Sequence, residues 1–314
     1  MTRLLLAALA LLVVGGLAWW WMTRPDPLPA FDAARAYTLV EAQTDFGPRI
    51  PGTAAHDSTR RFLIRRLQAH ADQVVEQQIR IPVPGDTARQ FAGTNIVASW
   101  QPELRRRILL AAHWDTRPQA DNDPDPTRRL EPVLGANDGA SGVAVLLEIA
   151  RLLDVHPIGR AVGVDIILFD LEDLGTNGPV ADELRVPFAM GSEMFVLNNP
   201  TYRPVWGVLL DMVGDRNLRI PREGFSQQHA PDVLDRVFAA AERTGATAFV
   251  DELGPAIQDD HVPFLRAGIP VVDLIHAPFP DTWHTTADTP ENVSAESLGQ
   301  VGRVVVDLLW REDD

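Results

Sequence analysis

The sequence predicts an α/β fold in which an open, twisted and largely parallel central sheet is flanked by helices. Three apolar runs of strand length, residues 164–171, 206–212 and 270–275, are separated by stretches with helical spacing. Strands that alternate with helices form parallel sheets, because a crossover helix brings the chain back to the start of the next strand. With 314 residues and a hydrophobic fraction of 46%, the chain can bury a core around such a sheet.

The N-terminal segment differs from the rest of the chain. Residues 4–22 carry no charge, and tryptophans at 19–21 are typical of a membrane interface. Because this stretch is just long enough to cross a bilayer, we expect residues 1–25 to anchor the chain in the inner membrane, with the rest in the periplasm. The alternative is a cleaved signal segment and an exported protein, although no clean cleavage site follows. We expect residues 26–37 to be a linker and residues 38–314 to be a single domain.

The further elements follow from the same patterns. Apolar residues with a spacing of three to four predict amphipathic or buried helices, and short apolar runs predict strands. The predicted helices are residues 56–72, 138–153, 231–244 and 295–310. Two more runs, residues 95–100 and 108–113, are expected to be neighbouring strands. Residues 117–132 and 176–187 are long loops, which in a compact domain commonly carry binding or lid functions. The first is acidic, which fits either calcium binding or a simply solvated loop.

Charge and cysteine content narrow the classes of function. The net charge is −15, which argues against a nucleic-acid partner because such proteins need a basic surface. The chain has no cysteine, so any metal must be bound by His, Asp or Glu.

Several segments carry potential metal ligands, and those with His113, with Glu172 and Asp173, and with Asp211 close apolar runs, the place where open α/β sheets bind ligands. The full set of potential ligands is His113, Asp138, Glu172, Asp173 and Asp211, with His284 beside Trp283 after a proline-rich turn. Imidazole and carboxylate ligands together suit zinc. Taken alone, Asp138 could be a simple N-cap and His113 a core histidine. Glu172 and Asp173 are harder to explain without a cation, because adjacent carboxylates repel each other where a buried strand ends. A metal could take one of them and leave the other as a general base.

A further cluster precedes a short predicted helix. Asp259 or Asp260 could cap that helix, and Gly268 could end it. Since one aspartate and His261 would then lack a structural task, Asp259 is a candidate site residue.

These segments together resemble the glutaminyl-peptide cyclotransferases (glutaminyl cyclases), a family within the zinc aminopeptidase-like superfamily. The resemblance covers roughly residues 38–310. It rests on the Glu172-Asp173 pair and on several longer runs. These runs are residues 46–53, 113–118, 259–265 and 278–284. The run after His113 is similar to the bacterial, animal-like branch of the family.

The resemblance implies a zinc exopeptidase-like fold and one catalytic Zn²⁺ per chain, bound by Asp138, Asp173 and His284. It implies that Glu172 is the general acid/base and that Trp283 is a wall of the substrate pocket. Asp211 and Asp259 would be catalytic as a hydrogen-bonded carboxylate pair.

The implied reaction converts the N-terminal glutamine of peptides or proteins to pyroglutamate and releases ammonia. We expect a monomer. The sequence departs from the animal enzymes at three places: Asp173 replaces Glu, Asp273 replaces His, and no tryptophan stands in the loop after Gly175.

Two other functions remain open at this stage. His113, Asp138 and Asp211 could bind a second metal, with Asp138 bridging, which would make the protein a two-zinc aminopeptidase of the same fold. A membrane-tethered binding domain without activity is the other alternative, and the presence of every candidate ligand argues against it.

Overall fold

The computed structural model describes residues 28–159 and 161–312. The expected anchor, residues 1–25, lies outside this part of the chain. Within the described residues, none of the helices combines the length and the apolar character needed to cross a membrane. The division into residues 1–25, 26–37 and 38–314 stays a prediction, except that helix α2 (Ala33–Thr44) already begins inside the expected linker. It does so because Asp32 caps the helix and Ala36, Leu39 and Val40 are buried.

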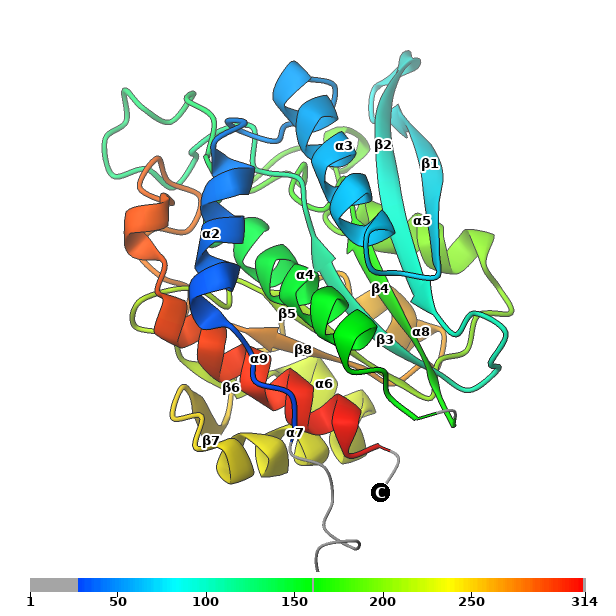
Figure 1. The fold of residues 1–314 in the computed structure, drawn as a ribbon. Helices are drawn as coiled ribbons and strands as arrows, with labels where there is room; N and C mark the ends of the chain where they lie inside the picture. The colour runs from blue at the N-terminus through cyan, green and yellow to red at the C-terminus, as the bar shows by residue number, and fades with distance from the viewer. Residues whose placement is uncertain (1–27, 160, 313–314) are drawn as a thin grey trace, which may run out of the picture.

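The predicted fold class is confirmed. A six-stranded sheet has the order β1-β2-β4-β3-β5-β8, and its last four strands are mutually parallel (Figure 1). The strands are β1 (Gln73–Val83), β2 (Asp86–Trp100), β3 (Arg107–His113), β4 (Gly163–Phe169), β5 (Trp206–Asp211) and β8 (Val271–Ile275). Strands β1 and β2 add an antiparallel edge. A separate pair is formed by β6 (Ile220–Arg222) and β7 (Phe249–Leu253).

Helices cover both faces of the sheet. Alternate residues of β3 point to opposite sides, so that Ile108 and Leu110 join one buried cluster while Leu109 and Ala111 join another. The larger cluster packs under α2, α3 (Ala54–Gln68), α4 (Ala140–Val155), α7 (Pro231–Thr244) and α9 (Ala295–Trp310). The smaller cluster packs under α5 (Met190–Asn198) and α8 (Val262–Arg266). The short α6 (Gly224–His229) contacts β8, and two 3₁₀ turns cover Asp182–Leu184 and Pro290–Asn292.

One predicted pairing was wrong. The strands expected at residues 95–100 and 108–113 exist, but they are not neighbours, because β4 lies between β2 and β3. The chain passes from β2 to β3 in a short connection and inserts β4 between them later. Strand β1 was not predicted, because it is an edge strand with many exposed residues and no continuous apolar run.

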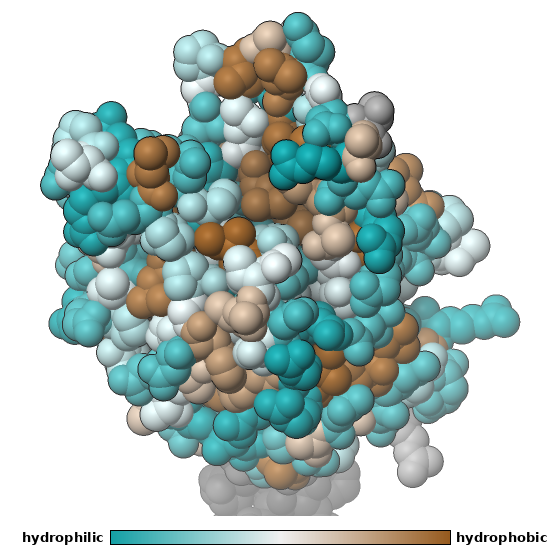
Figure 2. Space-filling model, turned by 90° about the horizontal axis from the view of Figure 1, so that it is seen from above, coloured by the Kyte–Doolittle hydropathy of each residue, from teal (hydrophilic) through white to brown (hydrophobic). Residues whose placement is uncertain are grey.

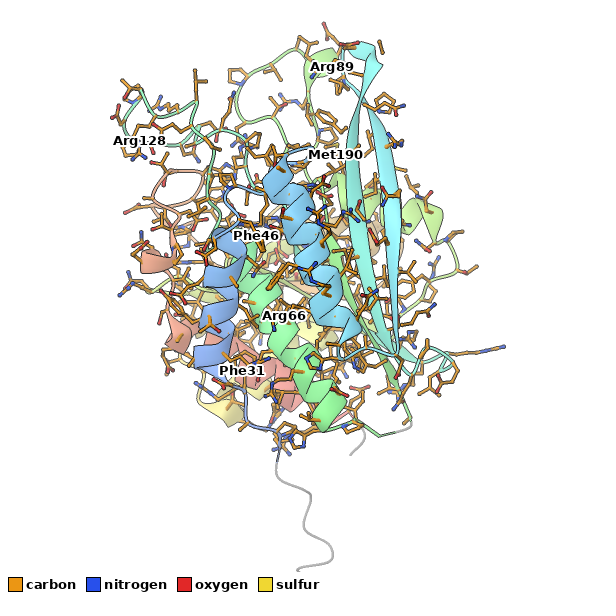
Figure 3. The ribbon with its side chains drawn as sticks, turned by 45° about the horizontal axis from the view of Figure 1, so that its top comes forward. Phe31, Phe46, Arg66, Arg89, Arg128 and Met190 are labelled. Carbon is orange, nitrogen blue, oxygen red and sulfur yellow. The ribbon has the colours of Figure 1, made fainter. Side chains whose placement is uncertain are left out.

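The parallel strands end on one side of the molecule, where the long loops gather. Figure 3 shows the loop that carries Arg128 and the hairpin that carries Arg89 rising above this side. Seen from the same side, Figure 2 shows hydrophobic residues around a hollow. This is where the predicted site residues lie.

Candidate metal and substrate site

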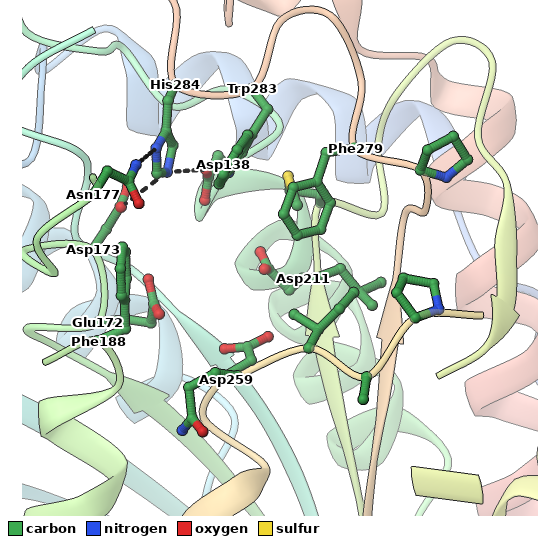
Figure 4. A pocket seen from close by; sticks show the side chains of 17 residues that line it. Asp138, Glu172, Asp173, Asn177, Phe188, Asp211, Asp259, Phe279, Trp283 and His284 are labelled. Carbon is green, nitrogen blue, oxygen red and sulfur yellow. Dashed lines mark hydrogen bonds and ion pairs between the residues drawn. The ribbon is translucent and has the colours of Figure 1, made fainter. Parts of the chain in front are cut away.

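A cavity of about 540 Å³ opens beyond the carboxyl ends of the parallel strands. All seven predicted site residues line it (Figure 4). They are Asp138, Glu172, Asp173, Asp211, Asp259, Trp283 and His284. Their roles stay predictions, but the fold brings them to one place from five separate segments of the chain.

The expected metal ligands form one buried group. Single oxygen or nitrogen atoms of Asp138, Asp173 and His284 all lie within 4.8 Å of one another. Nε2 of His284 is 3.2 Å from Oδ1 of Asp173 and 3.7 Å from Oδ2 of Asp138. Both carboxyl oxygens of Asp173 are buried without a hydrogen-bond partner. Buried oxygens of this kind are costly unless something binds them, so this group fits a divalent cation.

The loop before α4 places Asp138. Oδ1 and Oδ2 of Asp288 accept hydrogen bonds from the backbone N–H groups of Asn137 and Asp138, at 2.7 and 3.0 Å. Gly139 is the N-cap of helix α4; it has φ = 94°, and a Cβ on it would lie 2.8 Å from the carbonyl oxygen of Asp115. The helix has no side-chain cap at this end. Asp138 is therefore not the N-cap that its position in the sequence allowed, and it lines the cavity instead.

Arg49 fixes the same loop from behind. Its guanidinium is fully buried and donates to the carbonyl oxygens of Trp114, Leu134 and Gly135 at 2.6–2.9 Å. Burial lowers the pKa of Arg49 to about 10, although neighbouring aspartates favour its charge. One side chain thus joins the loops after β3 and before α4.

Glu172 and Asp173 lie on a tight turn after β4. Oδ1 of Asp115 accepts from the N–H of Glu172 and Oδ2 from the N–H of Asp173, both at 3.1 Å. Burial, together with the charges of Asp173 and Asp259, raises the pKa of Glu172 well above its usual value. A carboxyl group with a raised pKa can both take up and return a proton near neutral pH.

Three backbone positions at the site have positive φ without being glycine. They are Leu171 at 61°, Met212 at 48° and His284 at 55°. Each is next to a site residue or is one itself. Such conformations are strained for residues with a Cβ and persist where the surroundings enforce them, as at functional sites.

His284 is oriented by residues that the sequence did not reveal. Its Nδ1 lies 3.1 Å from Nδ2 of Asn177 and 3.5 Å from Oδ1 of Asp121. Asp121 comes from the acidic loop at 117–132, where Arg117 holds it at 2.6 Å. This part of the loop therefore contacts a residue of the site. The carboxylate of the neighbouring Asp123 accepts hydrogen bonds from Thr286 and from the N–H of Asp125.

A second buried group consists of His113, Asp138 and Asp211. Nε2 of His113 lies 2.9 Å from Oδ1 of Asp138 and 3.2 Å from Oδ1 of Asp211. Burial opposes a charge on His113, but hydrogen bonds with Asp115, Asp138 and Asp211 outweigh this and raise its pKa well above the usual value. The ligands that a second metal would need are thus present, as the sequence suggested.

The expected hydrogen-bonded pair of Asp211 and Asp259 needs a correction. Asp211 is engaged with His113, and no hydrogen bond joins it to Asp259 in the described part of the chain. The carboxyl group of Asp273 also lies close to Asp259, with single oxygens of the two groups within 4.8 Å. Asp211 acts on Asp259 through its charge: burial and this charge raise the pKa of Asp259 to about 7. The sequence could not reveal this, because the choice of partner depends on how β5 and β8 place their side chains.

Asp259 does not cap α8. The N-cap position is His261, whose side chain makes no capping bond, and Oδ1 of Asp259 accepts the N–H of its neighbour Asp260 at 2.5 Å. Asp259 therefore faces the cavity, as its selection as a site residue required.

Aromatic rings form the cavity wall. The Trp283 ring stacks on His284, with centroids 4.1 Å apart and planes at 29°, and contacts Phe279 at 4.4 Å. Phe188, from the loop that lacks the expected tryptophan, lines the cavity near Glu172 (Figure 4). The wall position predicted for Trp283 agrees with this geometry, and Phe188 is an aromatic wall residue that the sequence did not single out.

Comparison with known proteins identifies the family. Residues 95–309 match the model of peptidase family M28. A glutaminyl cyclase from Bacteroides thetaiotaomicron, solved with N-acetylhistamine, is 40% identical; the match covers 91% of this chain and all of that one, with a TM-score of 0.85. A structure described as a leucine aminopeptidase precursor from the same organism is also 40% identical, with 91% and 99% covered and a TM-score of 0.85. The bovine glutaminyl-peptide cyclotransferase is 27% identical over 295 residues, 84% of this chain and 79% of that protein.

The chain therefore belongs to peptidase family M28. Within that family, the resemblance to glutaminyl-peptide cyclotransferases that the sequence motifs indicated is confirmed.

Proposed function

We propose that the protein is a zinc-dependent glutaminyl-peptide cyclotransferase, and hence an acyltransferase, which converts N-terminal glutamine to pyroglutamate. The observation that carries the proposal is the cavity itself. It combines an aromatic wall with Glu172, a proton-binding carboxyl group, beside a buried ligand group. Its similarity to glutaminyl cyclases over nearly their whole length supports the same reaction.

Asp138, Asp173 and His284 would hold one Zn²⁺. When bound, zinc supplies a Lewis acid that polarises a carbonyl oxygen. Asp173 is one methylene shorter than the glutamate of the animal enzymes, but its Oδ1 lies 3.2 Å from Nε2 of His284, and one ligand atom of each of the three residues lies within 4.8 Å of the others, close enough to share an ion.

The remaining steps fall to the side chains of this chain. In cyclisation the α-amine attacks the γ-amide carbon of the same residue, and ammonia leaves. Glu172 takes a proton from the attacking amine and returns it to the departing nitrogen, which its raised pKa favours. The rings of Trp283 and Phe188 confine the short glutamine side chain, so that amine and amide stay close. Asp259 and Asp211 offer acceptors for the amine.

A two-zinc aminopeptidase is the alternative function, and the group of His113, Asp138 and Asp211 favours it specifically. We propose a single zinc because Nε2 of His113 lies within hydrogen-bond distance of both aspartates, so that a proton there links them in place of a metal. A histidine that donates from this nitrogen has no lone pair to offer a metal.

The decisive experiment compares Gln-β-naphthylamide and Leu-p-nitroanilide on the same preparation and measures zinc per chain. We expect cyclisation of the glutamine substrate, little cleavage of the leucine substrate and one zinc. Two zincs with faster cleavage of the leucine substrate would assign the protein to the aminopeptidases.

We also propose that the substrates are peptides or proteins with N-terminal glutamine in the periplasm, met by a monomer held at the inner membrane by residues 1–25. The uncharged stretch at residues 4–22 and the acidic composition of the rest support this.

A further inference from the structure

A chain of buried polar side chains lies behind Asp259. It consists of Glu223 just before α6, His261 at the start of α8, and Asp273 within β8. The exposed fraction is 1% for Glu223 and 0% for His261 and Asp273. None of the three lines the cavity, yet burying so many ionisable groups is costly unless they bind one another.

The imidazole of His261 lies between two carboxyl groups. Its Nε2 is 3.2 Å from Oε2 of Glu223, and its Nδ1 is 3.7 Å from Oδ2 of Asp273. Single atoms of Asp259, His261 and Asp273 lie within 4.8 Å of one another, so the chain reaches the cavity wall.

The far end of this chain is firmly anchored. Oε1 of Glu223 accepts the N–H groups of Phe225 and Ile257 at 2.9 and 2.8 Å. Its Oε2 accepts the N–H of Ser226 at 2.6 Å and the Ser226 hydroxyl at 2.7 Å. Burial disfavours the charge of Glu223, but the contacts with His261 and Ser226 outweigh this and lower its pKa to about 2. Glu223 is therefore an anion.

Asp273 has the opposite character. Burial and the negative charges of Asp259 and Glu223 raise its pKa well above the usual value, which favours its protonated form. Its own backbone N–H donates to the Ser226 hydroxyl at 3.0 Å, which ties β8 to the same anchor. Both oxygens of Asp273 and Oδ2 of Asp259 are buried without a hydrogen-bond partner, and single oxygens of the two carboxyl groups lie within 4.8 Å of each other. A proton on Asp273 would satisfy an oxygen of each group.

We propose that Glu223, His261 and Asp273 are positioning residues that hold Asp259 as the acceptor for the substrate's α-amine. In this arrangement the N–H of Asp260 binds one oxygen of Asp259, and a proton on Asp273 would bind the other, which is buried and unpartnered, so that the carboxylate stays turned towards the cavity. The ring of His261 lies between Glu223 and Asp273 and keeps Asp273 in place. The proposal rests on the proposed function only in so far as the substrate presents a free α-amine.

The test compares two substitutions of Asp273. Asp273→Asn keeps an N–H that can donate to Asp259, whereas Asp273→Leu has a similar size and no donor. We expect the KM of Asp273→Asn to stay within about threefold of wild type. For Asp273→Leu we expect KM to rise roughly tenfold or more, the effect of losing one buried hydrogen bond, with a smaller change in kcat and unchanged zinc content. His261→Gln is a second variant, with an expected rise in KM of about threefold to tenfold.

Asp307→Asn is the matched control. Asp307 is a buried carboxylate on α9 that binds Arg243 and Arg311 away from the cavity, so it should lower the melting temperature without changing KM. Equal losses for Asp273→Asn and Asp273→Leu, or wild-type KM in both, would overturn the proposal. If the Leu variant does not fold, the same conclusion is reached from Asp273→Asn and His261→Gln.

Failure of the proposed function can be told apart from failure of this inference. If wild-type protein cleaves Leu-p-nitroanilide and does not cyclise glutamine, the proposed function is wrong. The KM pattern can then be measured with the leucine substrate, which carries the same α-amine.

Discussion

The side chain of Asp115 holds the turn that carries Glu172: one of its oxygens accepts the backbone N–H of Glu172 and the other accepts the N–H of Asp173. The carboxylates of Glu172 and Asp173 take no part in these two hydrogen bonds. Both side chains line the cavity, and the position of Glu172, the proposed general base, is set by a residue that does not line the cavity. Two acidic groups can thus stand side by side on a buried turn without a side-chain hydrogen bond that would compete with their function.

Glu172→Gln should retain zinc and lose turnover by about 10²–10⁴-fold. The amide has a similar shape but cannot accept the proton of the attacking amine. The measurement is the rate of ammonia release together with metal analysis, and Glu193→Gln, an exposed change on α5, is the control. Cyclisation near the wild-type rate would remove Glu172 from the mechanism.

Asp121→Ala should weaken zinc binding by roughly 10–100-fold, because groups that orient a metal-binding histidine contribute about that much. Asp121 lies 3.5 Å from Nδ1 of His284 and lines up its ring. Zinc affinity can be measured by competition with a chelator. Asp125→Ala on the same loop is the control, since the side chain of Asp125 accepts hydrogen bonds from Thr127 and not from a site residue. Equal affinities for both variants would show that Asp121 does not support the ligand.

The metal-free protein should be more stable at pH 5.5 than at pH 8. Burial and the charge of a neighbouring aspartate raise the pKa of both Asp259 and Asp288 to about 7. An aspartate in the unfolded chain has a pKa of about 3.9. Each group therefore binds its proton more tightly in the folded state, and the resulting stability, complete below about pH 4, is lost as the pH rises through about 7.

Melting temperatures across this range check the pH dependence. Asp259→Asn, which cannot titrate, should show a smaller difference between the two pH values. Zinc added at pH 8 should restore stability, because a cation favours the ionised carboxylates. A melting temperature that rises towards pH 8 without metal would contradict the assignment.

The full-length protein should fractionate with membranes, whereas a chain that begins near Asp26 should be soluble and active. The reason is the uncharged stretch at residues 4–22. Immunoblots of membrane and soluble fractions measure it. Full-length protein in the soluble fraction with its N-terminus intact would be evidence against an anchor.

The sequence predicted the parts of the site that local pattern determines. Asp211 and the Glu172-Asp173 pair stand where apolar runs end, and parallel strands bring such ends together. The sheet itself followed from the same runs. The edge strand β1 escaped prediction because its exposed side chains give no periodic signal.

What sequence could not predict are contacts across long separations. Asp121 approaches His284, and Phe188 joins the wall, only because two irregular loops fold over the cavity. The expected hydrogen bond between Asp211 and Asp259 is not formed for the same reason: the two residues lie on different elements, and the side chain of Asp211 turns to His113.

The buried guanidinium of Arg49 has a consequence for proteolysis. It comes from the segment between α2 and α3, yet it donates hydrogen bonds to carbonyl groups of the loop that presents Asp138. Loss of the N-terminal segment through Arg49 would leave every metal ligand in the remaining chain and still release the loop. A protease that removed this segment could therefore empty the site without cutting near it, and metal content would report whether the amino-terminal helices are intact.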